Sequence, residues 1–247
     1  MLKFDRRYTL LIAQLVTPFI TILALWKYAT FPLVALSLVM WFMMRCVGSV
    51  ITYHRIHGHM SHTMHPVVEF ICTALGFYGS LSSPMQFCSV HTNHHKYTDT
   101  DKDPHPYNII GWKVMFPVFW YDAGKAAGDL RTVVRLRRNK IANFFHDYYW
   151  YLLPLPLLLI LISWNAFLFA YVVPLGMTLW SLGLSTLNHD KNGGAKYMGE
   201  LFGILTLGEH HHEWHHNNPS DTSGEGWLNM VINLIATKRV VEKKRTG

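Results

Sequence analysis

The chain has 247 residues, of which half are apolar and only 15% are charged. A soluble domain usually carries about a quarter charged residues, so the composition argues against an ordinary soluble protein. The formal net charge is +7, but the basic residues lie outside the long uncharged stretches, and nucleic-acid binding is a weak explanation of that charge. The three cysteines, Cys46, Cys72 and Cys88, show no metal-binding spacing and are expected to be free thiols.

Long uncharged stretches predict helices that cross a membrane. Residues 8–26 contain no charge, residues 31–53 contain only Arg45, and residues 148–189 contain none. A helix needs about 20 apolar residues to span a bilayer, so the last stretch is long enough for two crossings. The sequence therefore predicts an all-α integral membrane fold, one domain over residues 1–247, with four transmembrane helices at about residues 8–26, 31–53, 148–164 and 168–188.

The basic residues predict how these spans are oriented. With a cytoplasmic N-terminus, four spans place residues 54–147 and the C-terminus on the cytoplasmic side as well. Of the 22 Lys and Arg residues, only Lys27 then lies in an outer loop and only Arg45 within a span, as the positive-inside rule demands. Residues 70–90 are also uncharged, but their Gly and Ser residues and Pro84 favour a buried or re-entrant segment over a fifth crossing.

Histidine is several times more frequent than usual, with 16 residues, and it is clustered. The first cluster lies at the end of the second predicted span, the second has the pattern H-x-x-H-H, the third repeats that pattern, and a single histidine closes the fourth span. These candidates are His54 and His59, then His91, His94 and His95, then His212, His215 and His216, and finally His189.

The spacing of these histidines favours metal binding. Residues three and four apart share one face of a helix, so H-x-x-H-H places two or three imidazoles together. His54 and His59 are five apart and fit one site if the helix unwinds or tilts at its end. Imidazole suits zinc, copper, iron and nickel. Nine imidazoles exceed the four ligands of a structural zinc, and they suit two metals with four to five ligands each.

Three segments of this sequence resemble the histidine boxes of the membrane fatty-acid desaturases, most of all the acyl-CoA delta-9 type. They are Tyr53-His54-Arg55-Ile56-His57-Gly58-His59, then His91-Thr92-Asn93-His94-His95 with the following run to His105, and Gly208-Glu209 leading into His212-Glu213-Trp214-His215-His216. The order of the boxes and the four-span layout agree over about residues 8–220.

The resemblance implies an oxidoreductase that binds two irons in a cytosolic, histidine-rich cap. It implies activation of O2 with two external electrons and removal of two hydrogens from adjacent acyl carbons, giving a cis double bond, delta-9 by the same likeness. All nine histidines named above would be iron ligands. The family's fused haem domain is missing, so a separate ferredoxin or cytochrome is the expected electron donor.

Residues around the ligands are also expected to matter. Histidine ligands need hydrogen-bonded partners that fix their tautomers, and Asp101, Asp103 and Glu209 are the candidates. The family carries an Asn four residues before the equivalent of His189, where this chain has Ser185.

An acyl chain oxidised at mid-length must continue past the metals. Phe42 precedes His54 by twelve residues, and a helix rises about 1.5 Å per residue. Phe42 and Leu38, one turn further, are therefore candidates for the walls of a substrate tunnel.

Two alternatives remain open at this stage. One is a related membrane di-iron hydroxylase acting on an alkane, a sterol or a carotenoid. The other is a membrane metal transporter or zinc hydrolase, although a transporter should place its ligands near the bilayer midplane. The sequence leaves open whether the acyl chain is linked to coenzyme A, a carrier protein or a membrane lipid. It predicts no nucleic-acid partner.

Overall fold

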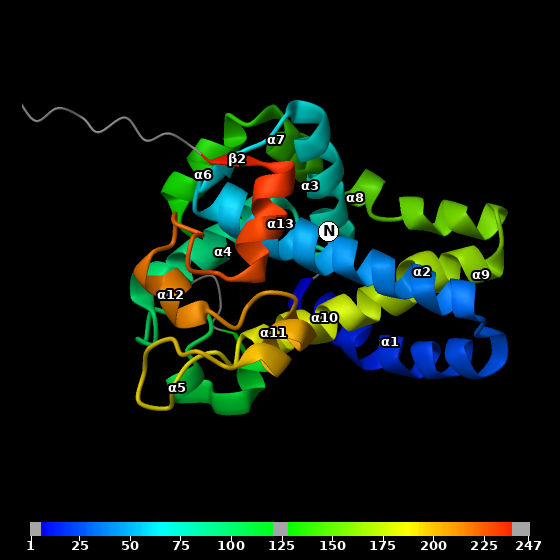
Figure 1. Cartoon of the computed structure of the whole chain (residues 1–247), viewed down its shortest axis with the longest axis horizontal. Helices are drawn as coiled ribbons and strands as arrows, with labels where there is room; N and C mark the ends of the chain where they lie inside the picture. The colour runs from blue at the N-terminus through cyan, green and yellow to red at the C-terminus, as the bar shows by residue number, and fades with distance from the viewer. Residues whose placement is uncertain (1–5, 121–127, 239–247) are drawn as a thin grey trace, which may run out of the picture.

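A computed structural model describes residues 6–120 and 128–238. Long helices extend toward one end of the molecule, and shorter helices gather at the other end (Figure 1). In chain order the elements are α1 (Arg6–Tyr28), α2 (Phe31–Phe42), the π-helix η1 (Met43–Gly58), β1 (His62–Thr63), α3 (Pro66–Ser80), α4 (Pro84–Tyr97), α5 (Tyr107–Ile110), η2 (Gly111–Met115), η3 (Pro117–Phe119), α6 (Leu130–Arg137), α7 (Lys140–Asp147), α8 (Tyr149–Leu152), η4 (Leu155–Leu161), α9 (Trp164–Phe167), η5 (Leu168–Val172), α10 (Val173–Ser185), α11 (Glu200–Thr206), α12 (His212–Asn217), α13 (Trp227–Ile235) and β2 (Thr237–Lys238).

Three continuous helices in the described part of the chain are long and apolar enough to cross a membrane: Arg7–Tyr28, Phe31–Gly58 and Trp164–Ser185. A fourth is present if Lys140–Asp147 and Tyr149–Leu161, which meet at an angle of 73°, form one broken span. The predicted all-α membrane fold is thus confirmed. Outward-facing residues such as Trp26, which is 82% exposed, provide the apolar surface that lipid requires.

The third predicted span is the one that differs most from expectation. Residues 148–164 were expected to form one helix, but a short α-helix gives way to the 3-10 helix η4. Pro154 precedes η4 and Pro156 lies within it, and proline removes a backbone donor and obstructs a continuous α-helix. The second span is longer than expected, because its helix runs on to Gly58.

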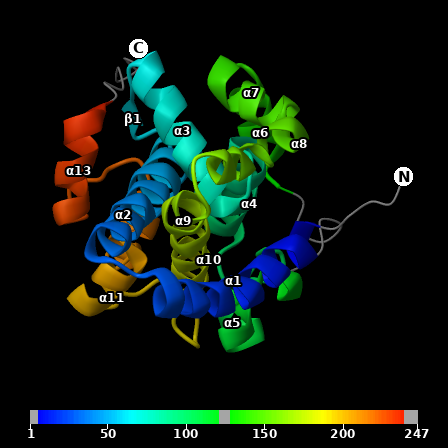
Figure 2. The ribbon, with the colours of Figure 1, turned by 90° about the vertical axis from the view of Figure 1, so that its right-hand side faces the viewer.

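The spanning helices pack around α10, which contacts both α1 and α2 (Figure 2). Gln14 of α1 is buried in this bundle, and its amide donates to the carbonyls of Leu179 (3.1 Å) and Met115 (3.2 Å). The indole of Trp180 donates in return to the Gln14 carbonyl at 2.8 Å. These bonds satisfy polar groups that lipid could not, and they tie α1 to α10 and to η2.

The π-helix η1 continues α2 and is buried along nearly its whole length. Side chains follow its wider turn: Ser49 donates to the Met44 carbonyl and Thr52 to the Val47 carbonyl, each five residues back. Gly48 of η1 meets Gly76 of α3 with backbones in direct contact, so a Cβ at Gly48 would collide with α3. Small residues at this crossing allow the two helices to approach closely.

Residues 70–90, predicted to be buried or re-entrant, form two helices with a turn between them. Leu81 ends α3 with φ 48°, and Ser83 caps α4 through a reciprocal pair of bonds with Gln86. Pro84 occupies the first turn of α4, where its missing N–H costs nothing. The turn thus directs α4, which carries the second histidine cluster, into the cap.

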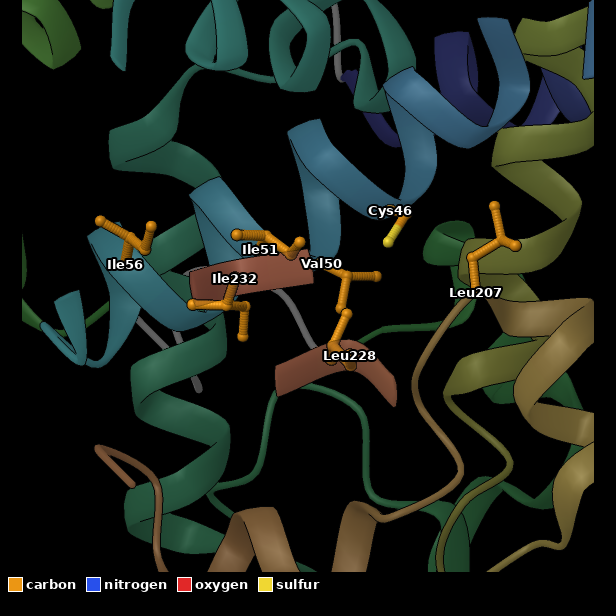
Figure 3. Close-up of a cluster of buried hydrophobic side chains, with 7 residues drawn as sticks. All are labelled: Cys46, Val50, Ile51, Ile56, Leu207, Leu228 and Ile232. Atoms are coloured by element: carbon orange, nitrogen blue, oxygen red, sulfur yellow. The ribbon is translucent and has the colours of Figure 1, made fainter. Parts of the chain in front are cut away.

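The C-terminal part closes the cap over η1. Leu228 and Ile232 of α13 pack on Val50 and Ile51, and Cys46, Ile56 and Leu207 complete this buried cluster (Figure 3). The two-residue strand β2 pairs antiparallel with β1. The three cysteines are free and buried, as expected.

Candidate metal centre

Four separate segments bring the nine candidate histidines together. They are the end of η1, the helix α4, the loop that follows α10, and the helix α12. In Figure 1 the labels α4 and α12 mark this region of the cap. The ligand atoms form two groups, within each of which they lie at most 4.8 Å apart. The five-imidazole group contains His54, His59, His91, His95 and His215, and the four-imidazole group contains His94, His189, His212 and His216.

Each H-x-x-H-H cluster contributes to both groups. On α4, His91 and His95 join the five-imidazole group and His94 the other. On α12 the division is reversed, because His212 and His216 join the four-imidazole group and His215 the other. The i and i+4 members face one group and the residue between them faces the neighbouring group, so the two groups lie side by side. The stacked rings of His95 and His216, with centroids 4.0 Å apart, mark this boundary.

The Nε2 atoms within each group point at one another. The distance is 2.7 Å between His54 and His215, 2.8 Å between His59 and His91, and 3.2 Å between His94 and His189. Neighbouring ligands at right angles, each about 2.1 Å from a shared cation, lie about 3 Å apart. The residues therefore fit two metal ions bound through Nε2.

Carboxylates face the opposite ring nitrogens. Nδ1 of His54 lies 2.9 Å from Glu209, Nδ1 of His94 2.9 Å from Asp103, and Nδ1 of His189 3.0 Å from Asp99. A carboxylate accepts the Nδ1 proton, and this tautomer leaves the Nε2 lone pair free for a metal. Nδ1 of His212 and of His215 also face carboxylates, at 3.6 Å from Glu209 and 3.4 Å from Glu225.

Burial favours the neutral, metal-binding form of His94, His95 and His212. It lowers the pKa of His212 to about 4, with the neighbouring His189 and Arg55 acting in the same direction. Burial likewise holds the pKa of His94 and of His95 well below its ordinary value. Burial alone would raise the pKa of Glu209, but His54 and Arg55 beside it lower that pKa well below its ordinary range. The site thus combines neutral rings with an ionised carboxylate.

Only some of the residues expected to hydrogen-bond the ligand rings do so. Asp103 and Glu209 contact ligand rings, whereas Asp101 is exposed and Asp99 takes the role expected for it. Asp99 adopts φ 59°, which turns its side chain toward the loop after α10, where it also accepts from the Gly194 amide. The hydroxyl of Ser185 forms its hydrogen bonds elsewhere: within the described residues it accepts from Arg45 at 3.0 Å and donates to the Leu182 carbonyl.

Two supporting residues were missed from the sequence, Arg55 and Glu225. Their positions are 170 residues apart, yet Arg55 Nε lies 2.7 Å from Glu225 Oε1. Arg55 directly follows a ligand in the first box, which was the available signal. Glu225 carries no local signal, since only the folding of the C-terminal segment onto η1 brings it to His215.

An apolar cavity of about 440 Å³ borders both groups. It runs between α1, α4, α10 and η1, and its walls include Leu10, Phe87, Leu179, Leu182 and the rings of His54, His91, His94, His189 and His212. Cavities of this size hold small apolar ligands.

Leu38 and Phe42 do not line this cavity, contrary to the tunnel hypothesis. Leu38 is 49% exposed on the outer face, and Phe42 packs on the buried cluster around Val50. The extrapolation assumed a regular α-helix, but the residues from Met43 onward wind as a π-helix, which changes the face that each position presents.

Several known enzymes are similar to this chain in sequence, at low identity. The chain is 25% identical to a delta-9 acyl-lipid desaturase of Arabidopsis thaliana over 70% of its length, and 27% identical to an acyl-CoA delta-9 desaturase of Acheta domesticus over 68%. The chain is homologous to the membrane fatty-acid desaturases. An acyl-CoA 5-desaturase of Anemone leveillei is 28% identical over 46% of the chain and 38% of its own length. The match spans about half the length of the first two relatives, 53% and 52%. No family model matches the sequence.

Proposed function

We propose that this chain is an O2-dependent fatty-acyl desaturase that introduces a cis double bond, delta-9, into a saturated acyl chain. The observation that carries the proposal is the pair of adjoining imidazole groups, five and four rings, that border one apolar cavity. The homologous delta-9 desaturases support the reaction and its position. An acyl chain in the cavity would lie beside both groups.

The residues of the chain have distinct parts in this reaction. The nine imidazoles would hold two irons, which supply the activation of O2 by two external electrons and the removal of two hydrogens from the acyl chain. Asp99, Asp103 and Glu209 hold Nδ1 protons, so that the Nε2 atoms stay oriented. Leu10, Leu179 and Leu182 give the cavity an apolar wall that would hold the acyl chain beside the rings and exclude water.

The membrane setting and the partners belong to the same proposal. The distribution of Lys and Arg favours cytoplasmic termini and a cytoplasmic histidine cap. Electrons would come from a separate ferredoxin or cytochrome, and the substrate would be an acyl chain linked to coenzyme A, a carrier protein or a membrane lipid. The homologues named above include both acyl-CoA and acyl-lipid enzymes.

The proposal is tested by expressing the chain in a desaturase-deficient host together with an electron donor, and analysing the fatty acids. Delta-9 monounsaturated products are expected, along with two irons per purified chain. His94→Ala should abolish both the product and the bound iron of the four-imidazole group. Hydroxylated products would favour the hydroxylase alternative, and a single tightly held zinc without iron would overturn the oxidase.

A further inference from the structure

We propose that Arg55 is the positioning residue that fixes the orientation of ligands in both imidazole groups at once. This inference rests on the proposed metal centre. Arg55 lies on η1 directly after His54 and is fully buried. The metal chemistry proposed above needs no role for it beyond that of a neighbouring charge.

The guanidinium of Arg55 holds two carboxylates. Its Nε lies 2.7 and 2.8 Å from the two oxygens of Glu225, and its Nη2 lies 3.7 Å from Glu209. Its Nη1 contacts the ring of His54. All three charged side chains are at most 3% exposed. Charges buried this deeply persist only when they are paired in good geometry.

The two carboxylates in turn face three ligand rings. Glu209 faces Nδ1 of His54, in the five-imidazole group, and Nδ1 of His212, in the four-imidazole group. Glu225 faces Nδ1 of His215, in the five-imidazole group. One guanidinium therefore reaches members of both groups through two carboxylates.

The remaining carboxylates serve a single group. Asp99 and Asp103 face His189 and His94, both in the four-imidazole group, and neither forms an ion pair with Lys or Arg in the described ranges 6–120 and 128–238. The carboxylates paired with Arg55 thus contact ligands of both groups. Asp99 and Asp103 contact ligands of the four-imidazole group alone.

Lysine cannot replace this arrangement. Arginine offers five N–H donors in a planar fork, whereas lysine is a point charge on a flexible stem. Arg55→Lys keeps the buried charge and so avoids leaving Glu209 and Glu225 uncompensated, but it loses the simultaneous hold on both. Loss of such outer support typically weakens metal binding about 10- to 100-fold.

The experiment uses the full chain in detergent, loaded with iron-57 and examined by Mössbauer spectroscopy and metal analysis. Glu225→Gln should alter only the signal of the five-imidazole position, and Asp99→Asn only that of the four-imidazole position. Arg55→Lys should alter both and weaken both affinities by 10- to 100-fold. Arg137→Lys is the matched control, because Arg137 is exposed and pairs only with Asn143 and Asp147 in the described structure. It should leave both signals unchanged.

An Arg55→Lys spectrum identical to that of the unaltered protein, or altered at one position only, would overturn the inference. If Arg55→Lys fails to accumulate, the double variant Arg55→Gln with Glu225→Gln provides the test. Glu225 faces a ligand of the five-imidazole group only, so a change at the four-imidazole position must come from Arg55 through Glu209, and its absence would overturn the inference. Failure of the unaltered protein to bind two irons would instead reject the proposed function itself.

Discussion

His54 and His59 lie one π-turn apart. The amide of His59 donates to the carbonyl of His54 at 3.3 Å, an i to i+5 bond, and both rings enter the five-imidazole group. An α-helix places residues five apart on different faces. The π-helical end of η1 therefore explains why the two ligands of this cluster are five residues apart. In the α-helical clusters the ligands are three or four residues apart.

This spacing predicts that the first cluster tolerates no change of register. The double variant Gly58→His with His59→Gly moves the ligand to an i+4 position, and a Cβ at residue 58 would lie 3.2 Å from the Tyr53 carbonyl. We expect iron binding at the five-imidazole position to be lost and about one iron per chain to remain. Metal analysis of the purified variant is the measurement. Retention of two irons would show that the π-turn is not required.

Individual ligands should be essential, whereas other histidines should not. His95→Ala and His216→Ala each remove one ligand from a different group, and we expect product formation to fall at least 100-fold. His65→Ala and His146→Ala are the controls, since these rings cap α3 and bond Ser83 away from the metal centre. The controls should cost about 1 kcal/mol of stability and keep their activity. Equal loss in both sets would contradict the assignment.

The cavity should determine which acyl chains are accepted. Leu10 of α1 lines it, so Leu10→Trp fills part of the 440 Å³ and should shift the product profile toward shorter chains. Leu38→Trp is the control, because Leu38 faces outward and is absent from the cavity wall. Competition between saturated substrates of graded length would measure the shift. A change with Leu38→Trp, and none with Leu10→Trp, would restore the discarded tunnel along α2.

Acid should destabilise the metal-free protein. The pKa of His212 is about 4 in the folded protein and 6.5 for the free group. Above pH 6.5, His212 is neutral in both states and does not change the free energy of unfolding with pH. As the pH falls from 6.5 to about 4, His212 is protonated in the unfolded chain but not in the folded protein, so the free energy of unfolding decreases. Between pH 6.5 and pH 4, His212 alone lowers the free energy of unfolding by about 3 kcal/mol.

The measurement is the unfolding temperature of the metal-free protein in detergent at pH 7 and pH 5. We expect a decrease at pH 5, and a smaller decrease for His212→Gln, which has no group to protonate there. Parallel decreases in both proteins would exclude His212 as a source of the acid sensitivity.

The Lys and Arg distribution predicts a cytoplasmic cap. Reporter fusions after Lys27, in the last turn of α1, and after Lys238 should therefore report opposite sides of the membrane. Reporting from the same side would mean that the bent pair α7 and α8 with η4 does not cross.

The sequence predicted the spans and the histidine clusters, which depend on local spacing. It did not predict residues whose positions depend on backbone conformation or on the packing of distant segments. Uncharged length predicted the spans, and the two H-x-x-H-H patterns identified six residues of the centre, to which the separate His189 adds a seventh. Leu38 and Phe42 lie outside the wall of the cavity, because the helix between them and His54 winds as a π-helix and not as the α-helix that the extrapolation assumed. Asp99 was not among the candidates, because no sequence pattern reveals the left-handed conformation at residue 99. Glu225 was invisible because α13 must first dock on η1.

The division of each H-x-x-H-H cluster between the two imidazole groups has a consequence for biosynthesis. Neither group is complete until α12, at residues 212–217, has been made, because each needs rings from it. Chains emerge from the ribosome N-terminus first, so the spanning helices and the first two histidine clusters are made before either group has its full set of ligands. A metal ion bound to the earlier histidines would therefore lack its full set of ligands until the C-terminal part of the cap had folded.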